Sequence, residues 1–138
     1  MKQIVVVYSH SGKAYDYAEA FAKQHNADLF RIEPKFEPRG FYAYVLRGYQ
    51  ATFKKPVKLK PDNLNLKHYE HMTLISPIHA GKMAAPVRSY LFTHRTYLPK
   101  VDVVLTHAAK DNDYKQAAVL LEEELKFKFN HVDSVTLV

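Results

Sequence analysis

Residues 3–14 read Gln3-Ile4-Val5-Val6-Val7-Tyr8-Ser9-His10-Ser11-Gly12-Lys13-Ala14. The first half is a continuous β-branched run without polar alternation, which is typical of a strand covered on both faces, as in a parallel sheet. The second half is a turn of small residues that holds the only glycine among the first 39 residues. From there the spacing becomes helical, because one face carries Ala14, Tyr17, Ala18, Phe21 and Ala22. Strand, glycine turn and helix in this order predict the first half of a β-α-β unit.

The alternation of strand and helix continues along the chain. Further strands are predicted at residues 28–32, 72–76, 101–106 and 132–138, and helices at 86–91 and 113–125. Pro86 suits the first turn of its helix, and Asp113 with Gln116 three residues later resembles a capping box. Strands separated by helices imply a parallel sheet joined by right-handed crossovers.

Residues 34–61 interrupt this pattern. The segment is rich in Pro and Lys, yet it also carries Phe36, Phe41, Tyr42, Tyr44, Tyr49 and Phe53. We expect an irregular crossover with a helix at 41–52 whose aromatic residues form no clean stripe. Four lysines near these aromatics, Lys54, Lys55, Lys58 and Lys60, could contact nucleic acid, but the pattern favours a solvated crossover.

The composition is that of a globular protein. The 138 residues are 47% hydrophobic and 25% charged, which fits one domain spanning residues 1–138. The absence of cysteine excludes disulfides, iron–sulfur clusters and thiol catalysis. No apolar segment approaches the roughly 20 residues that span a bilayer, so we expect a cytoplasmic protein without a membrane partner. A net charge of +6 fits an acidic protein partner, a phosphorylated ligand, nucleic acid, or simply a solvated face.

Three loops are expected to meet at the carboxyl ends of the strands, where doubly wound sheets bind ligands. They are Ser9–Ala14, Ser76–Met83 and Thr106–Asp113. In the first loop, backbone N–H groups at the helix N-terminus, two serine hydroxyls and Lys13 would attract an anion such as phosphate. An ordinary serine-capped turn without any ligand explains the same residues and remains open.

Residues 4–14 resemble the first strand and the Tyr-Ser-x-Thr-Gly-Asn-Thr phosphate loop of the flavodoxin family. Residues 76–87, read as Ser76-Pro77-Ile78-His79-Ala80-Gly81-Lys82-Met83-Ala84-Ala85-Pro86-Val87, are similar to that family's Thr-Pro-Val-Trp-Ala-Gly segment and the proline-started helix after it. Gly48-Tyr49 and the Lys-Pro stretch that follows resemble the crossover of small flavodoxin-like proteins. The likeness covers nearly the whole chain. It implies a flavodoxin-like three-layer α/β sandwich with a five-stranded parallel sheet in order 2-1-3-4-5, here without the final helix.

The resemblance implies a noncovalent site for flavin mononucleotide (FMN) and a role in electron transfer or quinone-type reduction. By position, the phosphate loop would be Ser9, His10, Ser11, Gly12, Lys13 and Ala14. The isoalloxazine ring would be flanked by Pro77, Ile78, His79, Ala80 and Gly81, with His107, Ala108 and Ala109 opposite.

Three positions depart from the family's pattern. Ala14 lacks a threonine hydroxyl, His79 replaces a stacking tryptophan, and Ala108-Ala109 replace glycines. At ~1 kcal/mol each, these changes would weaken FMN binding about 100-fold. The basic charge also differs from the acidic character of soluble flavodoxin carriers. The alternatives are therefore an FMN-dependent oxidoreductase, a binding module that has lost the flavin and docks an acidic protein, and, least favoured, a nucleic-acid-binding domain.

Two further expectations concern metals and assembly. His68 and His71 are three residues apart, but no acidic residue accompanies them in a ligand pattern, so no metal site is expected. Nothing follows the strand at 132–138 to form the family's last helix. Apolar side chains of the last two strands would then meet water on the first helix's side. We therefore expect a homodimer burying that face, or a chain whose natural C-terminus has been cut away.

Overall fold

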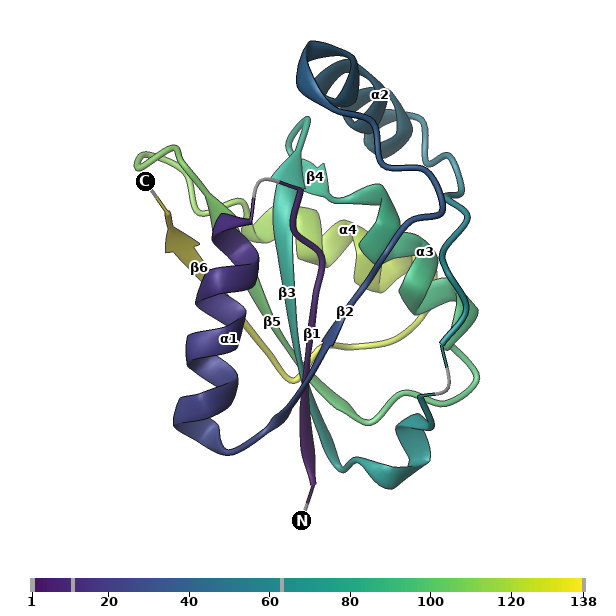
Figure 1. Ribbon diagram of the computed structural model, residues 1–138, viewed down its shortest axis with the longest axis vertical. Helices are drawn as coiled ribbons and strands as arrows, with labels where there is room; N and C mark the ends of the chain where they lie inside the picture. Colours follow the sequence, from purple (N-terminus) through teal and green to yellow (C-terminus); the bar gives the residue numbers. More distant parts are fainter. Residues whose placement is uncertain (1, 11, 63, 138) are drawn as a thin grey trace.

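The structure, a computed structural model, describes residues 2–10, 12–62 and 64–137 (Figure 1). The elements follow one another as β1 Gln3–Val7, α1 Lys13–His25, β2 Asp28–Arg31, α2 Gly40–Thr52, the 3-10 turn η1 Leu66–His68, β3 His71–His79, β4 Lys82–Met83, α3 Ala85–Thr93, β5 Lys100–His107, α4 Lys115–Leu125 and β6 His131–Thr136. Within the described residues, no helix is long and apolar enough to cross a membrane.

The sheet has the predicted topology. Five strands pair in parallel in the order β2-β1-β3-β5-β6, which confirms the expected order 2-1-3-4-5. The short strand β4 was not predicted, and it pairs antiparallel with the end of β3 through Ile78 and Met83. β3 therefore continues to His79, beyond the predicted end at Ser76, because the hairpin supplies partners for its last residues.

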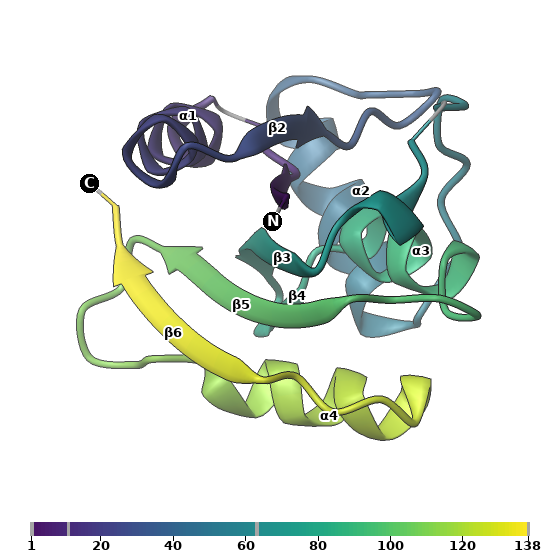
Figure 2. The same ribbon diagram turned by 90° about the horizontal axis from the view of Figure 1, so that it is seen from below.

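The sheet lies between two helical layers, as Figure 2 shows from below. On one face, α1 buries Ala14, Ala18 and Ala22 in a cluster with Val5 and Val7 of β1. Because these alanines are small, the helix axis can approach the valines of the sheet closely. Ile4 and Val6 of β1 point to the other face, as a strand's period of two requires.

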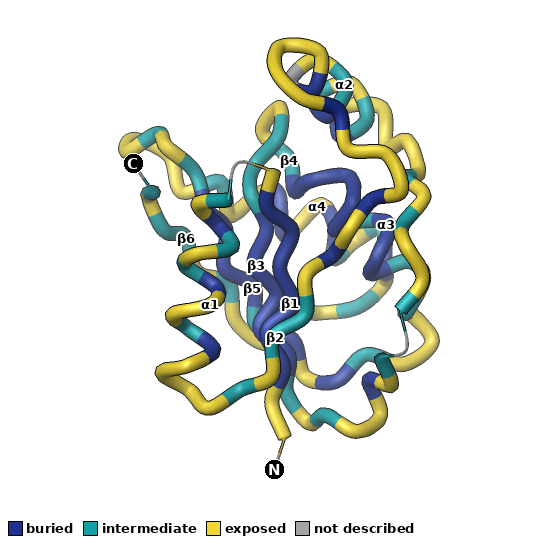
Figure 3. Tube along the Cα trace, in the orientation of Figure 1, coloured by how far each residue is buried: buried dark blue, intermediate teal, exposed yellow. Residues whose placement is uncertain are grey.

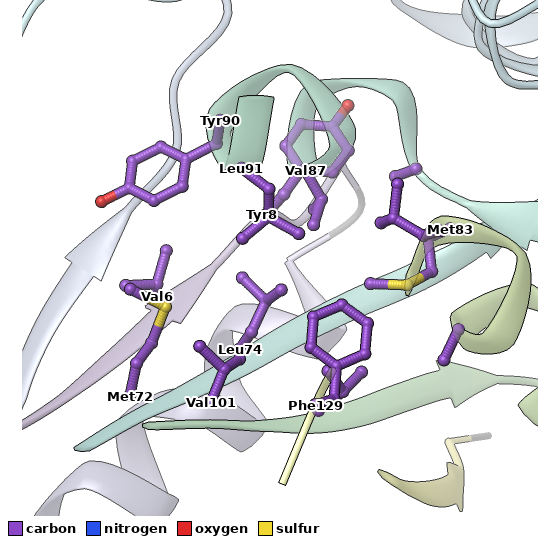
Figure 4. Packing of buried hydrophobic residues seen from close by; sticks show 14 of the residues in the cluster. Val6, Tyr8, Met72, Leu74, Met83, Val87, Tyr90, Leu91, Val101 and Phe129 are labelled. Carbon is purple, nitrogen blue, oxygen red and sulfur yellow. The ribbon is translucent and has the colours of Figure 1, made fainter. Parts of the chain in front are cut away.

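The second face carries the larger core, between the sheet and the helices α3 and α4. Figure 4 shows Val6, Leu74 and Val101 of three neighbouring strands packed against Val87 and Leu91 of α3. All five side chains are fully buried. The strands are thus covered on both faces, which explains why their sequences are continuous apolar runs.

The α1 side of β5 and β6 differs from our expectation. Val104 is only 6% exposed, and Val135 packs against the same cluster as Val104. The other positions on that side are polar: Asp102 pairs with His131, and Asp133 lies beside Val104 in the register. The predicted exposed apolar face is therefore wrong, and the reason to expect a homodimer through it is lost.

The start of α4 also differs from the prediction. The helix begins at Lys115, and Tyr114 stands at its N-cap in a left-handed conformation with φ 58°. Asp113 accepts a hydrogen bond from the backbone N of Lys115 at 3.1 Å, which is an Asx-type turn. The predicted capping box of Asp113 with Gln116 is therefore wrong. This conformation places the Tyr114 ring 5.0 Å from that of His107.

The crossover helix α2 lies at the carboxyl-end edge of the sheet, at the top of Figure 1. It confirms the helix predicted at 41–52. Ala43, Arg47 and Ala51 are buried on its inner side. We expected no clean aromatic stripe, yet four aromatic side chains and one valine line its outer side, which is exposed in Figure 3. We call these five the outer stripe: Phe41, Tyr42, Val45, Tyr49 and Phe53. The side chain of Tyr44 lies outside what the structure describes.

Candidate functional site

The three predicted loops do meet. A cavity of about 350 Å³ opens at the carboxyl ends of β1, β3 and β5. Its lining contains nine of the predicted site residues together with two others: Ser9, His10, Lys13, Ala14, Pro77, Ile78, His79, Thr106, His107, Ala108 and Leu137. We call it the loop cavity. Its volume falls within the range of small-molecule sites.

A second cavity adjoins the first. It measures about 420 Å³ and lies between α2, the β3–β4 hairpin and the start of α4. It is lined by His10, Gly40, Ala43, Arg47, Gly48, Ile78, His79, Ala80, Gly81 and Tyr114, and we call it the α2 cavity. His10, Ile78 and His79 belong to both linings, so the two cavities are neighbours.

The first loop is held in shape by its own hydrogen bonds. The Ser9 hydroxyl accepts a bond from the Gly12 backbone N at 2.9 Å, and Arg31 donates to the Ser9 carbonyl at 3.0 Å. Gly12 has φ 95°, a conformation that residues with a Cβ rarely adopt. As the N-cap of α1, Gly12 has no side chain to bond the first-turn N–H groups. An anion in the loop cavity would meet the positive end of this helix.

A charge network links this loop to α2. The Glu37 carboxylate accepts hydrogen bonds from the Tyr8 hydroxyl and from Arg47 Nη2, each at 3.1 Å, and His10 Nδ1 lies 3.1 Å from it. Arg47 is 3% exposed and also donates to Gln50 at 2.6 Å. Because Glu37 compensates the guanidinium, Arg47 can be buried beside the α2 cavity.

His79 stands at the centre of this arrangement. Its Nδ1 is buried and has no hydrogen-bond partner in the described part of the chain. Burial lowers the pKa of His79 to about 4, with the charges of Arg47 and His10 acting in the same direction. The ring is therefore neutral at neutral pH. The Tyr8 ring meets it edge-on, with centroids 6.1 Å apart.

A tight hairpin turn follows His79. His79 and Lys82 pair across two residues with positive φ, Ala80 at 52° and Gly81 at 76°. This is the geometry of a type I′ turn, whose second position favours glycine. Gly48 of α2 lies opposite, where an added Cβ would be 3.9 Å from that of Ala80. A Cβ at Gly48 would make only an ordinary van der Waals contact there, so α2 and the turn are close neighbours.

The third loop is ordered around His107. Its Nδ1 lies 2.6 Å from the Ala109 carbonyl, and its Nε2 is within hydrogen-bond distance of the Ser134 hydroxyl. Because a carbonyl can only accept, Nδ1 donates to Ala109. The two contacts fix the orientation of the His107 ring on the wall of the loop cavity.

The structure brings most of the predicted site residues together. Ala80 and Gly81 line the α2 cavity, Gly12 shapes the first loop, and Ala109 contributes only its carbonyl. Ser11 lies outside the described residues. Across those same residues, no group of three or more His, Asp or Glu could hold a metal ion.

Sequence reasoning missed the charge network. Glu37 and Arg47 lie in the crossover, which has no regular pattern to place them. A signal was present, because Arg47 is the only charged residue between Gly40 and Thr52. A lone charge in an apolar helix indicates either a solvated position or a buried, paired one, and only the fold distinguishes the two.

Solved structures share this architecture. The flavoprotein from Lactobacillus acidophilus NCFM in complex with FMN superimposes with a TM-score of 0.81 at 18% identity, over 96% of this chain and 92% of that one. The NMR structure of its apo-form gives 0.71 at 20% identity, over 96% and 89%. A WrbA-like flavodoxin from Agrobacterium tumefaciens gives 0.61 at 17% identity, over 99% and 85%. No protein-family model and no curated protein matches the sequence. The fold is flavodoxin-like, as the sequence predicted.

Proposed function

We propose that residues 1–138 form one flavodoxin-like domain that binds FMN noncovalently and acts in electron transfer or quinone-type reduction. The observation that carries this proposal is the loop cavity, whose lining joins the N-terminus of α1 to His79, a histidine whose buried Nδ1 has no hydrogen-bond partner among the described residues. The similarity to a flavoprotein solved with FMN supports the choice of ligand.

The residues present fit the phosphate end of FMN. Lys13 and Ala14, in the first turn of α1, line the cavity, and His10 stands beside them. Backbone N–H groups at a helix N-terminus with a nearby cation form an anion site. Arg31 holds the Ser9 carbonyl and so keeps the loop in this shape. Ala14 contributes no hydroxyl, so the phosphate would depend on backbone and charge.

The residues also fit the flavin ring. Pro77, Ile78 and His79 form one wall of the loop cavity, and His107 and Ala108 lie on the wall opposite in our assignment. The orphaned Nδ1 of His79 is a buried polar atom that a polar ligand atom could satisfy. Because burial keeps the pKa of His79 near 4, its ring offers stacking and hydrogen bonding without a charge at neutral pH.

When bound, the flavin would supply the capacity to accept and donate electrons. The role of this chain is to hold the ring and set its surroundings. The α2 helix and the hairpin turn at Ala80 would shield one side from water. The buried guanidinium of Arg47, on the wall of the adjoining cavity, would favour negative charge on a reduced ring.

The test is a titration that compares FMN with riboflavin, which lacks the phosphate. We expect Lys13→Gln to weaken FMN binding about tenfold and to leave riboflavin binding unchanged. The matched control is Lys115→Gln, because Lys115 stands at the same position in α4. Equal losses of affinity for FMN and riboflavin would contradict the assignment of this loop to the phosphate. A folded protein that neither quenches flavin fluorescence nor shifts flavin absorbance would leave the alternative, a module docking an acidic protein.

A further inference from the structure

The outer side of α2 is an apolar surface without a partner. The outer stripe contains five of the nine large hydrophobic side chains that are exposed in the described residues. Phe41 is 81% exposed, Phe53 62% and Tyr42 60%, and the other two are about half exposed. With roughly 150–250 Å² per aromatic side chain, the stripe offers on the order of 500 Å² of apolar area. This area is similar to that of the largest exposed apolar patch on a typical monomeric protein.

The stripe has the geometry of a helix-packing ridge. At about 100° per residue, its five positions fall within about 120° of one another. Phe41, Val45, Tyr49 and Phe53 follow one another at intervals of four, and the Tyr49 and Phe53 rings lie 5.0 Å apart. Rows of side chains with this spacing are the ridges that fit between the ridges of a facing helix, in the commonest class of helix packing.

The helix cannot turn this ridge inward. Its inner side holds Arg47 against Glu37 and places Gly48 against the turn at Ala80. Rotation about the helix axis would expose Ala43 and leave the Glu37 carboxylate without its guanidinium partner. The outward direction of the stripe is therefore imposed by contacts at the candidate site.

We propose that the outer stripe is the interface of a homodimer in which α2 of one copy packs on α2 of a second copy across a two-fold axis near Val45. A two-fold places the same ridge on both sides, so each copy supplies the complementary surface for the other. A standard interface takes about 800 Å² from each partner. The outer stripe supplies more than half of this area, and Phe36, which is 59% exposed in the segment before α2, adds to it.

The charges around the stripe are compatible with this packing. Arg47, the one charged residue of α2, is buried, so the facing ridges are uncharged. Cations stand only beyond the ends of the helix, at Arg39, Lys54 and Lys55. Helices crossing at about −50° diverge from their contact point, which separates these ends. The remaining repulsion is screened by salt, so the dimer should become tighter as ionic strength rises.

The first test measures the association state of the full chain by sedimentation equilibrium. We expect a monomer–dimer equilibrium whose dissociation constant rises at least about tenfold in Val45→Arg, because the charge would be buried at the axis. Val119→Arg is the matched control, since Val119 is a helical valine of similar exposure, 40% against 49%, on α4. A native-like chain that stays monomeric at high micromolar concentration would overturn the proposal, as would a dimer that Val119→Arg weakens more than Val45→Arg.

The second test uses the absence of cysteine from the chain. Val45→Cys provides one thiol, and a short bismaleimide should link two copies through it while leaving Val119→Cys unlinked. Equal linking of both variants would contradict the interface.

The competing occupant is a membrane surface, tested by sedimentation with phosphatidylglycerol vesicles. If the protein is a monomer that binds these vesicles, and Val45→Arg abolishes that binding, the outer stripe is a membrane contact and not a dimer interface.

Discussion

The helices α1 and α2 have the same length, 13 residues, but they differ in which kind of side chain is buried and which is exposed. α1 buries alanines against the sheet and turns its charged residues to water. α2 buries two alanines and an arginine and turns its aromatic residues to water. α1 lies across a β-sheet, while α2 lies across the α2 cavity and a hairpin turn. The partner of each helix, rather than its hydrophobicity, therefore determines which face is buried.

The largest expected effect is a difference in unfolding free energy between a buried alanine of α1 and a buried alanine of α2. Ala18 of α1 and Ala43 of α2 are both buried, at 0% and 1% exposure. We expect Ala18→Asp to lower the free energy of unfolding by about 4 kcal/mol or more, because the carboxylate would be sealed between helix and sheet. Ala43→Asp should cost about 2 kcal/mol or less, because its side chain would enter the α2 cavity beside Arg47. Urea unfolding of both variants measures the difference, and equal losses would contradict the contrast.

A second effect concerns His79, below α2. Its pKa is about 4 in the folded protein and 6.5 in an unfolded chain, so the unfolded state binds more protons between these values. Stability should therefore fall as the pH is lowered from about 6.5 to 4, by about 3 kcal/mol in total from this group. His79→Phe should remove this part of the acid sensitivity. Unfolding free energies of both proteins across that pH range provide the check, and parallel curves would show that His79 is not buried in neutral form.

The smallest effect concerns the hairpin turn near Gly48 of α2. Ala80 has φ 52° at the first central position of the hairpin, where asparagine is favoured over alanine. Ala80→Asn should raise the free energy of unfolding by about 0.5–1 kcal/mol, and the exposed position offers room for the larger side chain. Ala80→Val should have the opposite effect, because β-branched residues avoid this conformation. Thermal unfolding of the two variants tests both directions.

Much of the sheet could be predicted from the sequence because its signals are local. The valine run of β1, the turn at Gly12 and the alanine spacing of α1 each carry their own periodicity. The meeting of three loops followed from parallel topology alone, and the loop cavity confirms that convergence. Whether these residues hold FMN stays a prediction.

The errors have two causes, which are a strand alternation that was not followed residue by residue and a side chain that packs on a neighbouring loop. The exposed apolar face expected on β5 and β6 is wrong because strand alternation places Asp102 and Asp133 there. The capping box at Asp113 is wrong because Tyr114 takes a left-handed conformation and packs on His107.

The sequence alone determined the order of strands and helices, the parallel topology and the position of the glycine loop before α1, because short-range periodicity and chain connectivity suffice for each. Only the tertiary structure decided which side of α2 meets water. That choice depends on Glu37 receiving Arg47 and on Gly48 meeting Ala80, contacts between segments 10 to 32 residues apart. A helix with an arginine on one side and aromatic residues on the other can bury either side, depending on the contacts available. In this protein Glu37 pairs with Arg47, so the arginine side is buried.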